Sequence, residues 1–167
     1  GIKPIIGFEA YTTNKDHKIK KEDGLPAGRQ GKRTESNHLL LLAKNEEGYK
    51  NLMKLTTIAH IEGYYYRPRF DKETLAKYSK GIVCTSACML GEIAQSLISD
   101  NYDTARKTAE WFQEVFGKDY YLEVQRHEFE KFIDKAENTV IKEDLIKMVK
   151  NEKLVNEGVV KLSRDLG

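Results

Sequence analysis

Cysteine is scarce in this sequence: Cys84 and Cys88 are the only two among 167 residues. Their C-x-x-x-C spacing, with no second pair elsewhere, excludes a disulfide framework and a zinc ribbon. The start of the chain lacks the charged and apolar regions of a secretory signal, so we expect a reducing, cytoplasmic setting. The chain opens on Gly1 and runs directly into an apolar stretch, which indicates a piece of a longer protein.

Long hydrophobic runs are also missing. The longest, Leu39–Ala43, is far shorter than the ~20 residues that span a bilayer, so we expect no membrane-spanning segment and no membrane partner. The sequence is nevertheless 40% hydrophobic and 32% charged, a mixture that excludes a disordered chain and indicates a globular one.

An excess of one charge is the third feature that the sequence lacks. Lys and Arg number 28 against 26 Asp and Glu, which gives a net charge of +2. Nucleic-acid-binding domains usually carry a clustered basic face, and this balance does not predict one.

The pattern of apolar residues predicts strands alternating with helices. Strands separated by helices imply crossover connections, so we expect an α/β fold with a parallel sheet of about four strands. Residues 12–36 are predicted to form an exposed, mobile insertion and 64–70 an aromatic, basic loop. Strands are expected over 3–11, 38–43, 82–86 and 120–125. Helices are expected from Asn45 to 63, over 73–78, from the end of the segment 86–92 to about 99, over 103–116 and from 128 to 166.

Three side chains with metal-binding chemistry lie beside predicted strand ends. They are Glu9, His38 and Cys88, and a carboxylate, an imidazole and a thiolate all bind zinc or a similar divalent ion. Residue type and spacing alone favour more ordinary roles: a hydrogen-bonded carboxylate, a packed histidine and a small buried cysteine.

Other signatures of chemistry are weak or missing. The sequence contains no dinucleotide-binding or P-loop glycine motif, and Ser86 lacks the context of a nucleophilic serine. Arg67 and Arg69 have the side chains that bind phosphate through two hydrogen bonds, and the rings of 64–66 are able to stack on bases. A packed aromatic loop with solvent-facing arginines is the plainer interpretation of this segment.

Five sequence blocks occur in a recognisable order: GIKPIIGFEAY at 1–11, HLLLLAKN followed by GYKNL at 38–52, GYYYRPRFD at 63–71, SACMLGE at 86–92 and YLEVQRH at 121–127. Together they closely resemble the PHP (polymerase and histidinol phosphatase) domain of bacterial replicative DNA polymerase III alpha subunits. The GYYYRPRFD and SAC-x-x-GE blocks resemble the polymerase branch of the family. We therefore assign 1–127 to the core of a PHP domain, and 128–167 to a charged helical segment of the same domain.

The resemblance implies a distorted (β/α)7 TIM-like barrel that holds divalent metal ions (zinc, manganese or magnesium) at its strand ends. By motif, it makes Glu9, His38 and Cys88 metal ligands. The family's His-x-His and Asp-His-Gly motifs are expected before Gly1, and its Asp-x-His motif after Gly167. The chain is thus expected to be the central part of the barrel, with two unpaired sheet edges and marginal stability when isolated.

The resemblance also implies a function: part of a DNA-directed DNA polymerase, with metal-dependent 3′-to-5′ proofreading hydrolysis in family members that keep the full ligand set. No catalytic residue is assigned, and the isolated piece is expected to be inactive. The implied partners are DNA, the sliding clamp, the clamp loader and a proofreading exonuclease, with Arg67 and Arg69 near nucleic acid or a domain interface. Two alternatives remain: a stand-alone phosphoesterase of the histidinol-phosphatase type, and a non-catalytic platform for a separate exonuclease.

Overall fold

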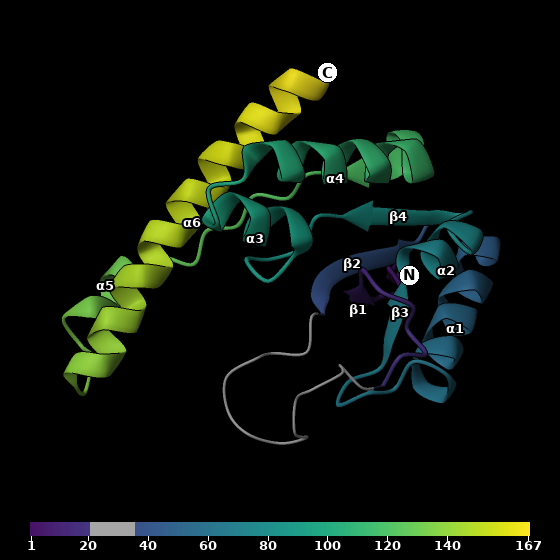
Figure 1. The fold of residues 1–167 in the computed structure, drawn as a ribbon, viewed down its shortest axis with the longest axis horizontal. Coiled ribbons are helices and arrows are strands. Elements are labelled where there is room, and N and C mark those ends of the chain that lie inside the picture. Colours follow the sequence, from purple (N-terminus) through teal and green to yellow (C-terminus); the bar gives the residue numbers. More distant parts are fainter. Residues whose placement is uncertain (21–35) are drawn as a thin grey trace.

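The structure of this chain is a computed structural model that describes residues 1–20 and 36–167, and its centre is a mixed sheet (Figure 1). The five strands are arranged in the order β3-β1-β2-β4-β5. β2 is antiparallel to both of its neighbours, β1 and β4, whereas β3 is parallel to β1 and β5 is parallel to β4. The strand bounds are β1 Gly7–Thr13, β2 Asn37–Ala43, β3 Arg69–Asp71, β4 Ile82–Thr85 and β5 Tyr120–Tyr121.

The α/β class is confirmed, but the prediction of a parallel sheet is wrong for β2. Parallel neighbours need a long crossover connection, usually a helix, whereas antiparallel neighbours do not. The sequence predicted no helix between β1 and β2, and β2 returns beside β1 in the antiparallel direction. The other four strands share one direction, and within the described residues the sheet is open, with β3 and β5 at its edges. Closure into a barrel therefore stays an expectation from the resemblance.

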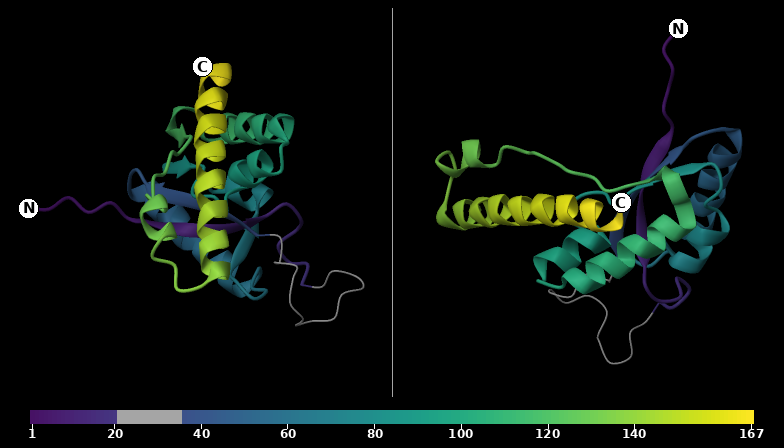
Figure 2. Two further views of the ribbon diagram at one scale, coloured as in Figure 1. Left: turned by 90° about the vertical axis from the view of Figure 1, so that its left-hand side faces the viewer. Right: turned by 90° about the horizontal axis from the view of Figure 1, so that it is seen from above.

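Several predicted boundaries differ from the structure. Residues 1–6 are not in a strand and extend away from the body of the protein, with Ile2 98% exposed (Figure 2). Three residues of the expected exposed insertion, 12–36, are buried: Thr12 and Thr13 within β1, and His17 beyond it. The remainder of that segment, 21–35, lies outside the described residues. β3 was missed because two of its three residues, Arg69 and Phe70, fall in the predicted aromatic loop.

The helices largely follow the prediction, since their starting signals are local. As expected, Asn45 caps the first helix, its side chain accepting a hydrogen bond from the Gly48 N–H. Asn101 and Asn138 cap α4 and α6 in the same way. The helices are α1 Glu46–Ile61, α2 Lys72–Lys77, α3 Glu92–Ile98, α4 Tyr102–Phe116, α5 Glu130–Ile133 and α6 Thr139–Leu166, with a 3-10 turn η1 at Gly117–Asp119.

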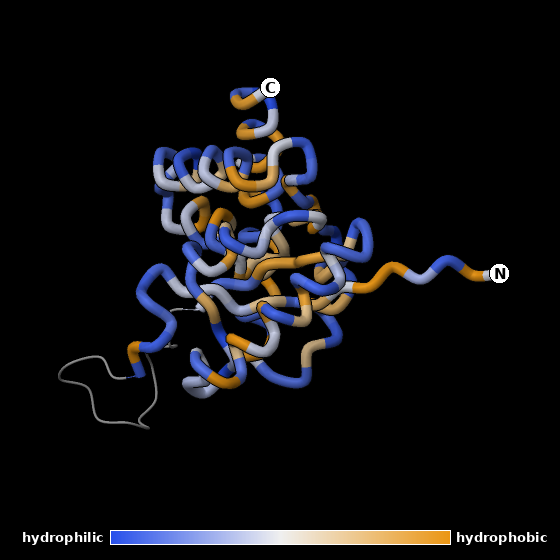
Figure 3. The backbone as a smooth tube through the Cα atoms, turned by 90° about the vertical axis from the view of Figure 1, so that its right-hand side faces the viewer, coloured by the Kyte–Doolittle hydropathy of each residue, from blue (hydrophilic) through white to orange (hydrophobic). Residues whose placement is uncertain are grey.

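The core lies between one face of the sheet and the helices. Alternate strand residues point to opposite faces, and those of one face are buried together with apolar residues of α1, α3 and α4. Figure 3 shows these apolar stretches gathered inside the molecule. The strand residues of this cluster are Ala10, Leu39, Leu41, Phe70, Ile82 and Cys84. The opposite face of the same strands is therefore the one left to carry polar side chains.

The long helix α6 joins this body through its C-terminal half. Val155, Val159 and Leu162 are buried, and α6 packs against α3 and α4. The other end of α6 extends past the sheet and carries α5 alongside it (Figures 1 and 2). Among the helices that the structure describes, none is both long enough and apolar enough to cross a membrane.

A glycine in the first turn of α1 provides a test of this packing. A Cβ at Gly48 would lie 1.7 Å from the backbone carbonyl oxygen of Gly81. Alanine normally stabilises a helix by about 1 kcal/mol relative to glycine. We expect Gly48→Ala to lower the free energy of unfolding instead, by about 1–3 kcal/mol, as overpacking does. Urea unfolding measures this change.

Gly158→Ala in α6 is the control, because the nearest atoms to a Cβ there belong to the side chain of Leu97, with its methyl groups at 2.8 Å, and a side chain can move. Its effect should be smaller than that of Gly48→Ala. A higher unfolding midpoint for Gly48→Ala would contradict the close approach of α1 to Gly81.

Candidate metal centre

The polar face of the sheet begins with the pairing of β1 and β2. Tyr11 lies opposite His38 and Glu9 lies opposite Leu40, and paired residues share a face. Glu9, Tyr11 and His38 therefore point away from the core that contains Ala10 and Leu39. Because β2 runs in the reverse direction, its first residues lie beside the carboxyl end of β1.

The structure brings the three predicted ligands together. The His38 Nδ1 atom lies 2.8 Å from the Glu9 Oε1 atom and 3.5 Å from the Cys88 Sγ atom. The side chain of His38 is 11% exposed, whereas that of Glu9 is 51% exposed. One nitrogen of a largely buried ring thus faces an accessible carboxylate and a thiol that come from separate parts of the chain.

The loop after β4 places Cys88 over His38. The His38 N–H donates a hydrogen bond to the Leu90 carbonyl, and the Leu90 N–H donates to the Cys88 Sγ atom. Ala87 has a positive φ of 57°, a conformation that non-glycine residues seldom adopt. Gly91 lets the loop close, since a Cβ there would lie 2.3 Å from the Ser86 carbonyl oxygen. The position of the thiol is thus determined by the backbone around it.

The donor set suits a divalent ion. Imidazole, carboxylate and thiolate all bind zinc, and zinc sites combine such ligands from different segments. The His38 Nδ1 atom lies near both the Glu9 carboxylate and the Cys88 thiol, although the ligand atoms of these three residues do not all come within 4.8 Å of one another. By their chemistry, these three residues therefore suit the ion that the resemblance implies.

A pocket adjoins Cys88 on the side of α6. Cys88 and Met89 line it together with Glu123, Glu152 and Asn156. The Glu152 carboxylate accepts a hydrogen bond from the His127 N–H, and the Asn156 side chain donates to the Gln125 carbonyl. Helix α6 thereby holds 125–127 beside the candidate metal centre.

The two arginines that the sequence singled out have different surroundings. Arg67 is exposed, and its guanidinium carbon lies 4.8 Å from the centre of the Tyr11 ring. That ring makes an edge contact with His38, with 4.9 Å between ring centres. Arg67 thus lies next to the candidate metal centre, with one aromatic ring between them.

Arg69 is buried and binds backbone instead. Its guanidinium donates hydrogen bonds to the carbonyl oxygens of Gly63 and Ile19, at 3.4 and 2.9 Å, and lies 5.2 Å from the Tyr65 ring. The side chain therefore ties the segment after β1 to the turn before β3. A contact of either arginine with nucleic acid or another domain stays a prediction. Arg67 is the better placed for it, because Arg67 is exposed and Arg69 is buried.

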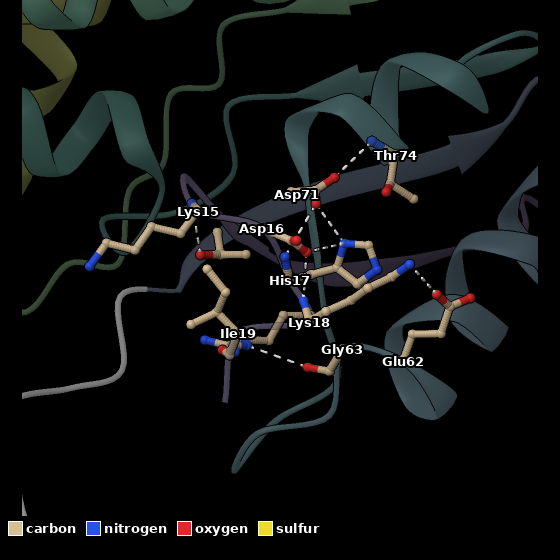
Figure 4. Close-up of polar contacts among 11 residues, drawn as sticks. Lys15, Asp16, His17, Lys18, Ile19, Glu62, Gly63, Asp71 and Thr74 are labelled. Atoms are coloured by element: carbon tan, nitrogen blue, oxygen red, sulfur yellow. Dashed lines mark hydrogen bonds and ion pairs between the residues drawn. The ribbon is translucent and has the colours of Figure 1, made fainter. Parts of the chain in front are cut away.

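A second polar cluster was not predicted, and Figure 4 shows it in close-up. The His17 Nδ1 atom lies 2.6 Å from the Asp71 Oδ2 atom and 4.0 Å from the Asp16 Oδ1 atom. The ligand atoms of these three residues lie within 4.8 Å of one another, close enough to hold a cation. The cluster joins the segment after β1 to the start of α2.

The contacts of Asp71 indicate that this second cluster is a clasp. Its Oδ1 atom caps α2 by accepting from the Thr74 N–H, and its Oδ2 atom accepts from the His17 N–H and faces the ring. Burial raises the pKa of Asp71, but the hydrogen bonds from Thr74 and His17 outweigh burial and lower it to about 2. Asp71 before a short helix was a readable capping signal, whereas His17 was hidden in the predicted insertion.

The α/β fold is consistent with a comparison of the sequence with known families. Residues 1–127 match the family described as the PHP domain. This chain belongs to the PHP domain family.

Three relatives of the chain carry the same name. It is 47% identical to the DNA polymerase III subunit alpha of Borreliella burgdorferi over 167 residues, all of this chain and 12% of that protein. It is 38% identical to that of Chlamydia trachomatis over 99% of this chain and 13% of that protein. Against Helicobacter pylori, identity is 44% over 80% of this chain and 11% of the protein. The chain thus spans only about an eighth of the length of these relatives.

The different surroundings of the two cysteines predict different reactivity. Burial raises the pKa of Cys84 well above its ordinary value, whereas Cys88 is partly exposed. Because the thiolate is the reactive form, we expect iodoacetamide to modify Cys88 at least about tenfold faster in the native protein. Mass spectrometry of the labelled peptides measures both rates.

Zn²⁺ should slow the labelling of Cys88 and leave the rate of Cys84 unchanged. In Cys88→Ser, fast labelling should disappear and Cys84 should react only in denaturant. Equal rates for the two native thiols would contradict the placement of Cys88.

The clasp predicts a stability change at low pH. A carboxyl group whose pKa falls from 3.8 to about 2 on folding stabilises the folded state above pH 4, and this stabilisation is lost as the pH falls towards 2. Asp71→Asn should be less stable than the unmodified protein at pH 6 and should lose less stability between pH 4 and 2. Urea unfolding at each pH measures this.

Asp16→Asn is the matched control, since the Asp16 side chain is 58% exposed and should leave the pH dependence in place. An unchanged acid dependence in Asp71→Asn would show that other groups are responsible for it.

Proposed function

We propose that this chain is part of a DNA polymerase III alpha subunit and that its PHP domain binds a divalent metal through Glu9, His38 and Cys88. The observation that carries the proposal is the approach of the Glu9 carboxylate and the Cys88 thiol to the His38 Nδ1 atom, at 2.8 and 3.5 Å. The names of the relatives support the polymerase, and the match to the PHP domain supports the metal.

The proposed reaction at this centre is 3′-to-5′ hydrolysis of a phosphodiester, which would contribute proofreading. A bound metal ion would supply a Lewis acid and a more acidic water. Glu9 and His38 would hold the ion, and the thiol of Cys88 favours zinc over magnesium or manganese. Arg67, one ring away, has an exposed positive charge that would bind the phosphate of the substrate.

The wider role follows from the polymerase subunit. The proposal gives the full-length protein DNA as its substrate and the other replicase subunits as its partners: the sliding clamp, the clamp loader and a proofreading exonuclease. It also places the protein in the cytoplasm, where thiols stay reduced, and Cys84 and Cys88 are both free. The names of the relatives do not support the alternative of a stand-alone phosphoesterase.

Metal analysis of the full-length protein tests the ligand set. The unmodified protein should retain metal after desalting. His38→Ala, Glu9→Gln and Cys88→Ser should each lower the affinity for Zn²⁺ at least about tenfold. Removing a residue that orients a ligand lowers metal affinity by that much, and removing the ligand itself should lower it at least as far. Plasma mass spectrometry and competition with a chelating dye measure metal content and affinity.

His60→Ala is the control, since His60 is an exposed histidine of α1. Metal content that is unchanged in His38→Ala would refute the ligand assignment. Metal that is retained without any hydrolysis of a labelled 3′ end would instead support the non-catalytic platform.

A further inference from the structure

The turn between α1 and β3 presents aromatic rings in an unusual way. Tyr66 has a φ of 59°, in the left-handed region that a bulky side chain rarely occupies. Its side chain is nevertheless 57% exposed, and Tyr64 is 52% exposed. Such backbone strain persists only where the surroundings enforce it, and it concentrates at ligand-binding sites.

The surroundings of this turn do enforce its shape. The Tyr65 N–H donates to the Arg67 carbonyl at 3.1 Å, and the buried Arg69 donates to the Gly63 carbonyl. A Cβ at Gly63 would lie 1.8 Å from the Arg69 carbonyl oxygen, so this position accepts only glycine. The Tyr65 ring packs edge-on against Tyr66, with 4.7 Å between ring centres. The turn is therefore fixed before any ligand arrives.

The same turn ends beside the candidate metal centre. Arg67 directly follows Tyr66 and lies over Tyr11, whose ring contacts His38. The exposed Arg67 therefore adjoins the Tyr11 ring beside His38, and the exposed Tyr66 precedes it directly in the chain.

We propose that Tyr66 and Arg67 form a binding platform for an unpaired nucleotide, with the base stacked on the Tyr66 ring and its phosphate bound by the Arg67 guanidinium. Exposed aromatic rings bind single strands by stacking on bases, without preference for sequence. In a duplex each base is stacked on its neighbours, so the platform selects a frayed or single-stranded end. This inference deepens the proposed function, since the bound strand would be the one that the metal centre hydrolyses.

Photo-cross-linking of the full-length protein tests the platform. The probe is a single-stranded oligodeoxynucleotide with 5-iodouracil at its 3′ nucleotide, and EDTA is present to prevent hydrolysis. We expect a cross-link to the peptide that contains 64–66, identified by mass spectrometry. Tyr66→Phe should keep the cross-link, and Tyr66→Gly should reduce its yield about tenfold, as loss of one stacking ring does. Arg67→Ala should reduce the yield as well.

The choice of glycine keeps the test free of a folding artefact, because glycine adopts the φ of Tyr66 without strain. Tyr49→Ala is the control, since Tyr49 is 41% exposed in α1. An unchanged cross-link in Tyr66→Gly would overturn the proposal, and so would equal cross-linking of a blunt duplex. If another domain of the same protein covers Tyr66, no cross-link forms, and this result would overturn the proposal too.

The two proposals fail separately. If the metal ligands are wrong, the metal content does not depend on His38 but the cross-link at Tyr66 remains. If the platform is wrong, the cross-link is absent or independent of Tyr66 while metal binding is unchanged.

Discussion

The reversed direction of β2 is the constraint on which the candidate metal centre depends. It places the first residues of the strand beside the carboxyl end of β1, so that His38 lies opposite Tyr11 and faces Glu9. The backbone N–H of His38 also holds the loop that carries Cys88, through the Leu90 carbonyl. One residue thus joins three segments through its backbone, its Nδ1 atom and its ring. If β2 were parallel to β1, its first residues would lie beside the amino end of β1, and these contacts would be lost.

Much of the fold was readable because its signals are local. The cap of α1 at Asn45, the apolar stripe of α4 and the apolar run of β2 each depend on residues close together in the sequence. The direction of β2 depends on the relation between distant strands, which periodicity does not record. β3 has three residues and was read as loop for the same reason, since its pairing with β1 defines it.

The candidate site was predictable to a similar extent. Residue type named Glu9, His38 and Cys88 only as weak candidates, and the resemblance made them ligands; the structure then brought them together. The pairing of His17 with Asp71 in the clasp was not readable, because 54 positions separate the two residues in the sequence. Nor could the sequence show that Arg67 and Arg69 have different environments. Arg69 differs because its guanidinium is hydrogen-bonded to backbone carbonyl groups.

The two polar clusters contain similar side chains, and hydrogen bonding assigns them different roles. Both carboxylate oxygens of Asp71 are used, one by the cap of α2 and the other by the backbone and ring of His17. A cation there would have to displace bonds that hold two segments together, so the fold opposes its binding. Glu9 is half exposed, so an ion has direct access to its carboxylate. The hydrogen bonds that an ion would have to break therefore argue against metal binding at the clasp, whereas the proposed centre keeps an accessible carboxylate at Glu9.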